Sequence, residues 1–251
     1  MSNIFDLGGK VAIVTGANTG IGQAIALSLA AAGADIAAVG RTPAEETIEK
    51  VRALGRKAEI VSADLSSIEP VQRVVDETIE KLGGLDILIN NAGIIRRADS
   101  VDFTEEDWDA VIDTNLKSTF FLAQAAGRHM LAQGSGKIVN IASLLSFQGG
   151  IRVPSYTASK SGVAGLTKLL ANEWAARGVN VNAIAPGYIA TNNTAALQAD
   201  EIRNRQIQER IPAGRWGGPS DIGGAAVFLA SPAANYIHGH VLAVDGGWLA
   251  R

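Results

Sequence analysis

The stretch Lys10-Val11-Ala12-Ile13-Val14-Thr15-Gly16-Ala17-Asn18-Thr19-Gly20-Ile21-Gly22 decides the expected fold. Its first six residues form an apolar, β-branched run that is typical of a strand buried on both faces of a parallel sheet. The glycines are followed by a helix-forming run from Gln23 to Ala32. Glycines between a strand and a helix let the backbone approach a diphosphate, which the free N–H groups and the dipole of the helix stabilise. The stretch therefore predicts a dinucleotide-binding loop, and the alternative is a glycine turn needed only for packing.

The alternation of apolar runs and helical segments continues to the end of the chain. Further strands are predicted at 34–39, 57–62, 85–89, 136–141, 179–184 and 240–244, with helical segments between them. No repeat, low-complexity tract or linker interrupts this pattern. We therefore expect an α/β fold with a doubly wound parallel sheet and helices on both faces, in a single domain over residues 1–251. The polar helical segment at about 188–215 is expected to form a mobile lid over the substrate.

Composition limits the classes of partner and chemistry. Of 251 residues, 47% are hydrophobic and 19% are charged, which indicates a globular chain. The 22 basic and 25 acidic residues include no basic block, so a nucleic-acid partner is not expected and the substrate should be small. The absence of cysteine excludes thiolate chemistry and fits the cytoplasm. No export signal, membrane anchor or metal site is predicted, because the 3 histidines have no acidic neighbour at ligand spacing.

A tyrosine and a lysine suggest acid–base chemistry. Tyr156 and Lys160 lie four residues apart and share one helix face. An ammonium held near a phenol favours the phenolate, so the phenol can exchange a proton nearer neutral pH. Ser143 follows the strand at 136–141, which brings all three side chains to the edge where parallel sheets bind ligands. Asn115 lies within a helical segment, where asparagine is unfavourable, and this indicates a polar role. Taken alone, the Tyr–Lys pair could equally belong to a solvated helix.

The residues after the second, third and fourth strands bear on the cofactor. The second strand ends in Gly40-Arg41 without a carboxylate, and a guanidinium suits a 2′-phosphate, so Arg41 favours NADP(H) unless it is only a solvated side chain. Asp64 is placed to accept hydrogen bonds from adenine, or to cap the next helix. The turn Asn90-Asn91-Ala92-Gly93 could hold the loop against a cofactor or cap a turn. Pro186-Gly187 would form a wall for the nicotinamide.

These motifs, in this order, resemble the short-chain dehydrogenase/reductase family along the whole chain. The resemblance implies a seven-stranded sheet, NAD(P)-dependent hydride transfer and a homotetramer. It implies Tyr156 as the proton donor or acceptor, Ser143 as its orienting partner, Lys160 as the cation that lowers the tyrosine pKa, and Asn115 as the anchor of a relay water. The implied cofactor-binding residues are Gly16, Asn18, Thr19, Gly20, Ile21, Gly22, Arg41, Asp64, Leu65, Asn91, Ala92, Gly93, Tyr156, Lys160, Pro186, Gly187, Ile189 and Thr191.

Within the family, the segments 95–97, 146–154, 190–194, 211–217 and 248–251 are similar to dehydrogenases that interconvert a keto and a hydroxyl group on a 3-deoxy or 2-deoxy sugar acid in hexuronate breakdown. Those enzymes usually use NAD(H), so both cofactor forms stay open. A carboxylated sugar needs a cation, and we expect Arg152 first and Arg96 second. The predicted substrate-binding residues are Arg96, Ser143, Gln148, Arg152 and Asn193, and Arg251 could reach a neighbouring subunit. The alternatives are a 3-oxoacyl thioester reductase and a non-catalytic dinucleotide-binding protein.

Overall fold

The computed structural model describes residues 3–251 and is built on a seven-stranded sheet in which all paired strands are parallel. The strand order is β3-β2-β1-β4-β5-β6-β7. This confirms the doubly wound fold class, and each predicted strand overlaps an observed one. Met1 and Ser2, the start of the stretch for which no export signal is predicted, lie outside the described residues. The strands are β1 (Val11–Thr15), β2 (Asp35–Gly40), β3 (Ala58–Ser62), β4 (Ile87–Asn90), β5 (Gly136–Ile141), β6 (Val179–Pro186) and β7 (Val241–Val244).

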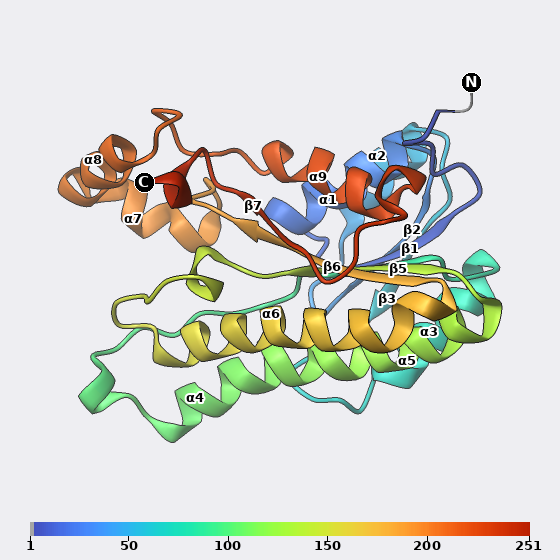
Figure 1. Ribbon diagram of the computed structural model, residues 1–251, viewed down its shortest axis with the longest axis horizontal. Coiled ribbons are helices and arrows are strands. Elements are labelled where there is room, and N and C mark those ends of the chain that lie inside the picture. Colours follow the sequence, from blue (N-terminus) through green and yellow to red (C-terminus); the bar gives the residue numbers. More distant parts are fainter. Residues whose placement is uncertain (1–2) are drawn as a thin grey trace.

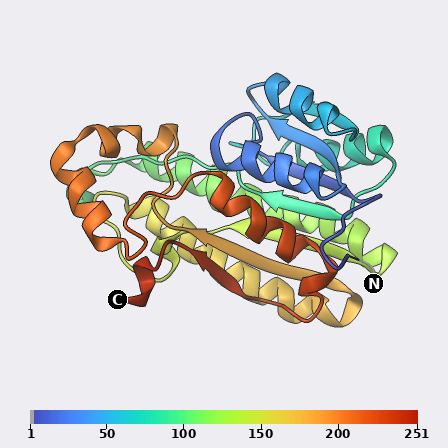
Figure 2. The same cartoon turned by 90° about the horizontal axis from the view of Figure 1, so that it is seen from above.

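Helices cover both faces of the sheet (Figure 1). Alternate residues of β1 contact different helical layers. Ala12 and Val14 pack against α1, α2 and α9, whereas Val11 and Ile13 face the cluster of α3, α5 and α6. Figure 2 shows α1 and α9 side by side above the strands. A strand buried on both faces needs apolar residues at every position, as in the run at the start of the chain. The helices are α1 (Gly20–Ala31), α2 (Glu45–Ala53), α3 (Val71–Leu82), α4 (Glu105–Ile112), α5 (Ser118–Gln133), α6 (Pro154–Trp174), α7 (Ala195–Ala199), α8 (Glu201–Arg210) and α9 (Ser220–Ala230).

The order of the strands creates a crevice at their carboxyl ends. β1 pairs with β2 on one side and with β4 on the other, so the chain leaves β1 in one direction and later returns to its opposite side. Loops that follow two such strands diverge and leave room for a ligand between them. Figure 1 places α7 and α8 beyond this edge, beside the C-terminus. The polar segment after β6 therefore lies where a substrate would enter.

The long helical segment predicted over 104–133 is interrupted. α4 and α5 are joined by a π-helical turn, Asp113–Lys117, which carries the buried Asn115. Such single turns are frequent at functional sites because they redirect side chains out of the regular helical pattern. The asparagine that is unfavourable in an α-helix thus lies at the one irregular turn of this segment.

Candidate active site

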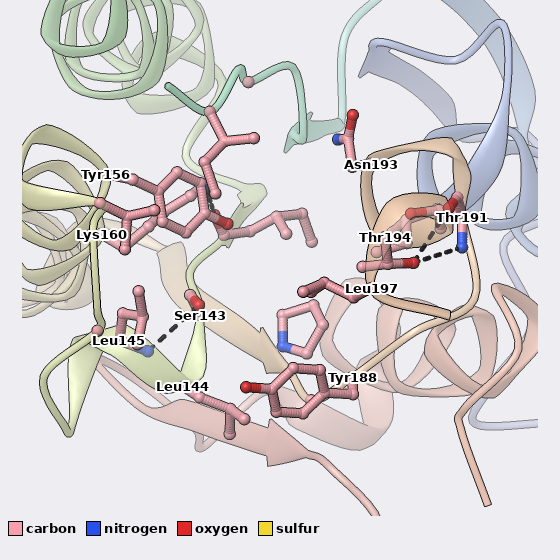
Figure 3. Close-up of a pocket in the computed structure, with 18 of the residues that line it drawn as sticks. Ser143, Leu144, Leu145, Tyr156, Lys160, Tyr188, Thr191, Asn193, Thr194 and Leu197 are labelled. Carbon is pink, nitrogen blue, oxygen red and sulfur yellow. Dashed lines mark hydrogen bonds between the residues drawn. The ribbon is translucent and has the colours of Figure 1, made fainter. Parts of the chain in front are cut away.

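A cavity of about 730 Å³ opens at the carboxyl edge of the sheet. It runs from the glycine loop after β1, past the loops that follow β4, β5 and β6, to α8. Figure 3 shows Tyr156, Lys160 and Ser143 on one side, facing Thr191, Thr194 and Leu197 on the other. This volume lies within the range of about 300–1,000 Å³ that is usual for small-molecule and cofactor sites.

The glycine loop has the backbone geometry that the sequence predicts. Gly16 and Gly20 have φ values of 65° and 58°, in the left-handed region that favours glycine. The Thr15 hydroxyl accepts hydrogen bonds from the backbone N–H groups of Asn91 and Ala92 at 2.9 and 2.8 Å, and the Asn91 amide donates to the Thr15 carbonyl at 2.8 Å. These contacts fix the loops after β1 and β4 against each other at the crevice.

The residues around the loop fit a dinucleotide. The first N–H groups of α1 point out of the helix, the Thr19 side chain does not cap them, and no acidic residue lies in the first turn. A diphosphate supplies the acceptors and the negative charge that such a helix end favours. The predicted cofactor residues that line the cavity are Gly16, Asn18, Thr19, Gly20, Ile21, Gly22, Asn91, Ala92, Gly93, Tyr156, Lys160, Pro186, Gly187 and Thr191.

Four predicted cofactor residues do not line the cavity. The Arg41 guanidinium lies 3.7 Å from the Asp64 carboxylate, and these side chains are 78% and 53% exposed. Asp64 also accepts the Ser66 N–H at 3.0 Å, and this backbone bond, followed by the Ser66 side chain, lowers the Asp64 pKa. It does not cap α3, which begins only at Val71. The side chains of Leu65 and Ile189 are buried in the core, and the Ile189 carbonyl accepts a hydrogen bond from the Thr194 hydroxyl at 2.7 Å.

The structure brings Ser143, Tyr156 and Lys160 together. α6 begins at Pro154, so Tyr156 lies in its first turn and Lys160 one turn later. The Lys160 ammonium is buried, donates to the Ile141 carbonyl at 2.6 Å and lies 5.6 Å from the centroid of the Tyr156 ring. The Ser143 hydroxyl accepts the Leu145 N–H at 3.2 Å, which holds it at the end of β5 beside the phenol.

The electrostatics of the tyrosine differ from the sequence prediction. Burial raises the pKa of Tyr156, and the Ser143 hydroxyl and the positive charge of Arg97 only partly oppose it. Burial also lowers the pKa of Lys160 to about 8. Lys160, whose ammonium donates to the Ile141 carbonyl, is not among the groups that lower the Tyr156 pKa in this structure, so its role toward the tyrosine stays a prediction.

Asn115 fixes the loop after β4 to the π-helical turn. Its side-chain oxygen accepts the Ile94 N–H at 2.8 Å, and its side-chain nitrogen donates to the Ile94 carbonyl at 2.9 Å and to the Ser159 hydroxyl at 3.4 Å. These bonds hold the β4 loop against α6, close to Tyr156. The role of Asn115 as the anchor of a relay water stays a prediction.

The predicted substrate residues divide into two groups. Gln148 and Asn193 line the cavity, as does Ser143. The Arg96 guanidinium instead lies 3.1 Å from Asp107, and that of Arg152 lies 2.9 Å from Asp99 on the exposed surface. Neither arginine lines the cavity. The cavity lining therefore does not support the prediction that Arg152 first and Arg96 second bind the substrate carboxylate. The reason is that nearby carboxylates already neutralise both.

Other cations line the cavity in their place. Arg97 follows Arg96 in the sequence but turns into the cavity, and Arg203 and Arg210 reach it from α8. The sequence prediction did not single out Arg203 or Arg210, and it included Arg97 only as part of the segment 95–97. The signal that could have indicated the α8 pair is their spacing of seven residues, which places both on one helix face. Arg251 donates to the carbonyl oxygens of Glu209 and Arg210 within its own chain.

Across residues 3–251, no cluster of three or more His, Cys, Asp or Glu side chains has the arrangement needed to hold a metal ion. None of the helices within the same range combines the length and the apolar character needed to cross a membrane.

Comparison with known proteins gives the family. Residues 16–249 match the family model described as enoyl-(acyl carrier protein) reductase. The 2-dehydro-3-deoxy-D-gluconate 5-dehydrogenase of Escherichia coli is 60% identical over 248 residues, which cover 98% of each chain. The chain belongs to the short-chain dehydrogenase/reductase family. A relative from Bacillus subtilis with the same name as the E. coli protein is 58% identical. The match covers 100% of this chain and 99% of the relative.

A solved structure of a short-chain dehydrogenase/reductase agrees with the fold. It is a candidate 2-deoxy-D-gluconate 3-dehydrogenase from Agrobacterium tumefaciens with bound NADP, 61% identical to this chain, and the two chains cover each other completely at a TM-score of 0.92. The arrangement of Ser143, Tyr156 and Lys160 beside a glycine loop is thus set in a backbone shared with close relatives.

Proposed function

We propose that this protein is an NAD(P)-dependent oxidoreductase that interconverts a keto and a hydroxyl group on a 3-deoxy or 2-deoxy sugar acid in hexuronate catabolism. The reaction would be of the 2-dehydro-3-deoxy-D-gluconate 5-dehydrogenase or 2-deoxy-D-gluconate 3-dehydrogenase type, the activities named for its relatives. The observation that carries the proposal is the composition of the cavity. Ser143, Tyr156 and Lys160 share it with three arginines, and no Asp or Glu is among its lining residues.

The chain's own groups provide the proton chemistry. When bound, the dinucleotide supplies or accepts the hydride at the reacting carbon. The Tyr156 phenol donates a proton to the reacting oxygen during reduction and accepts it during oxidation. The Ser143 hydroxyl, held by the Leu145 N–H, orients that oxygen, and Lys160 holds a buried positive charge behind the phenol. Because burial raises the Tyr156 pKa, the protonated form needed for reduction predominates at neutral pH.

Arg41 supports NADP(H) as the cofactor. Its guanidinium is 78% exposed at the end of β2, and its only ionic partner among residues 3–251 is Asp64, at 3.7 Å. Such an exposed pair contributes little stability, so the guanidinium is free to bind a 2′-phosphate instead. The similar Agrobacterium structure has bound NADP.

We also propose that the segment at about 188–215 acts as a lid within one catalytic domain, and that the protein works as a homotetramer in the cytoplasm. The position of α7 and α8 across the cavity supports the lid. Size-exclusion chromatography with light scattering would test the tetramer, and a monomeric mass would contradict it.

The function is tested by following NAD(P)H absorbance with a panel of substrates. We expect turnover of 2-dehydro-3-deoxy-D-gluconate or 2-deoxy-D-gluconate, with NMR of the product showing which carbon reacted. A second candidate is reduction of a 3-oxoacyl thioester, the activity named for a 3-oxoacyl-[acyl-carrier-protein] reductase of Staphylococcus aureus that is 42% identical over 241 residues. Faster turnover of acetoacetyl thioester than of either acid would support that candidate. Cofactor binding without turnover of any substrate would support a non-catalytic dinucleotide-binding protein.

A further inference from the structure

The part of the cavity beyond the catalytic groups is positively charged. Arg97, Arg203 and Arg210 line it, and neither aspartate nor glutamate does. Within residues 3–251 none of these three arginines forms an ion pair, whereas Arg96 and Arg152 on the surface both do. Unpaired guanidinium groups around a cavity favour an anionic ligand, because a carboxylate can accept two parallel hydrogen bonds from one guanidinium.

α8 presents a polar stripe to this cavity. Arg203, Gln206, Ile207 and Arg210 line it, at the spacing that places residues on one helix face. Ile207 is buried against Leu144 and Trp248, which fixes this face of α8 toward the cavity. Leu144 directly follows Ser143, so the end of α8 that carries Arg210 lies close to the catalytic groups. Arg203, two turns earlier, lies farther out.

Arg210 is held in place by stacking on an aromatic ring. The central carbon of its guanidinium lies 3.9 Å from the centroid of the Trp248 ring, a favourable cation–π contact. Trp248 in turn donates its indole N–H to the Gln148 side chain at 3.3 Å. A cation fixed before the ligand binds loses less conformational entropy on binding than a free arginine. Stacking also occupies the face of the guanidinium and leaves its N–H edge for an acceptor.

Arg97 occupies a different position. Its guanidinium donates to the Asn193 carbonyl at 3.5 Å, in the segment after β6, and its charge partly opposes the rise of the Tyr156 pKa. The carboxylate of a sugar acid lies far along the carbon chain from a hydroxyl at carbon 5, but close to one at carbon 3. For a reaction at carbon 5, the carboxylate of an extended substrate therefore needs a cation other than one that acts on the phenol.

We propose that Arg210 binds the substrate carboxylate and sets the preference for a sugar acid over a neutral sugar. Gln148, which accepts a hydrogen bond from the Trp248 indole on which Arg210 stacks, is its neighbour. The inference rests on the proposed function and names its specificity residue. Contact between the carboxylate and Arg210 also ties the substrate to α8, so that binding draws this helix toward Ser143.

The test compares two substrates that differ only at one end, 2-deoxy-D-gluconate and 2-deoxy-D-glucitol. Arg210→Met keeps an unbranched side chain on Trp248 but removes the charge. It should lower kcat/KM for the acid by at least about tenfold, mainly through KM, while kcat/KM for the alcohol stays within about twofold. Arg210→Lys keeps the charge and should retain more of the preference for the acid than Arg210→Met. Calorimetry of 2-deoxy-D-gluconate binding to each enzyme with cofactor gives a readout independent of turnover.

Arg205→Met is the matched control, because Arg205 is exposed on α8, does not line the cavity and lies 3.9 Å from Glu209. Arg205→Met should leave kcat/KM unchanged for both the acid and the alcohol. Should Arg210→Met fail to fold, as judged by its thermal unfolding midpoint, Arg210→Gln takes its place. An equal loss for acid and alcohol, or no loss for either, would overturn the assignment of Arg210. A wild-type enzyme that shows no preference for the acid would instead overturn the proposed function, and this result is read before any variant is compared.

Discussion

Replacing Gly22 by alanine should weaken dinucleotide binding by roughly tenfold to a hundredfold in a protein that still folds. A Cβ at this position would overlap the Gly16 carbonyl oxygen and would lie only 2.5 Å from the Asn91 side-chain nitrogen. Ordinary contacts between such atoms are about 3.5–4 Å, so the start of α1 would have to retreat by on the order of 1 Å. The N–H groups of its first turn would move away from the diphosphate position with it.

The size of the effect follows from these contacts. One hydrogen bond to a charged acceptor is worth about 1.5–3 kcal/mol, so the loss of one bond gives the expected range. The strain of the added methyl group costs about 1–3 kcal/mol of folding stability, less than the total of about 5–15 kcal/mol that is usual for a domain. The variant should therefore unfold at a lower temperature but remain folded at 25 °C.

The assay is a fluorescence titration with NADPH and NADH, together with thermal unfolding. Gly84→Ala is the control, because its Cβ would meet nothing within 4 Å and its backbone is not left-handed. That change should leave binding unaltered and raise stability slightly, by restricting the unfolded chain. If folded Gly22→Ala bound both dinucleotides within about twofold of the wild type, the close contact between α1 and the glycine loop would not be what positions the diphosphate.

Three further outcomes are expected. Tyr156→Phe should reduce turnover by about 10²–10⁴-fold and leave the cofactor dissociation constant within a few-fold, which steady-state rates and a titration measure; a rate above about a tenth of the wild type would exclude Tyr156 as the acid. Arg41→Ala should lower kcat/KM with NADP(H) but not with NAD(H), and equal effects would leave Arg41 as a surface residue. Arg97→Gln removes a charge that lowers the Tyr156 pKa, so the increase of the oxidation rate with pH should move to higher pH. An unchanged pH profile would contradict this role.

The fold was predictable because its determinants are local. Val11 to Val14 of β1 are all apolar, and alternate residues face two different helical layers, so burial on both faces is visible in the residue types alone. The glycine loop and the spacing of Tyr156 and Lys160 are likewise short-range features. The π-helical turn at Asn115 was not predicted, since the asparagine signals only that a regular helix is unfavourable and not how the chain departs from it.

The substrate end of the site was predicted less well, because it depends on contacts between distant segments. Arg96 and Arg97 are identical in type and adjacent in sequence, yet one pairs with Asp107 in α4 and the other turns into the cavity. Arg152 was expected to bind substrate from its position before the catalytic helix, and no local pattern indicates that Asp99 neutralises it. Side-chain direction in a loop and competition between carboxylates are decided by tertiary packing, which no local pattern records.

The two ends of the cavity recognise anions by different means, and this difference bears on how the site can change its substrate. At the glycine loop the positive charge comes from backbone N–H groups and a helix dipole, which depend on glycines and on the close approach of Gly22 to Gly16. At α8 it comes from side chains, which can be replaced one at a time without disturbing the sheet. A substitution at Arg210 therefore alters one contact, whereas a substitution at Gly22 displaces a helix. We infer that substrate specificity in this architecture changes through α8 and the β5–α6 loop, while dinucleotide binding, shared by every substrate, stays with the backbone of β1 and α1.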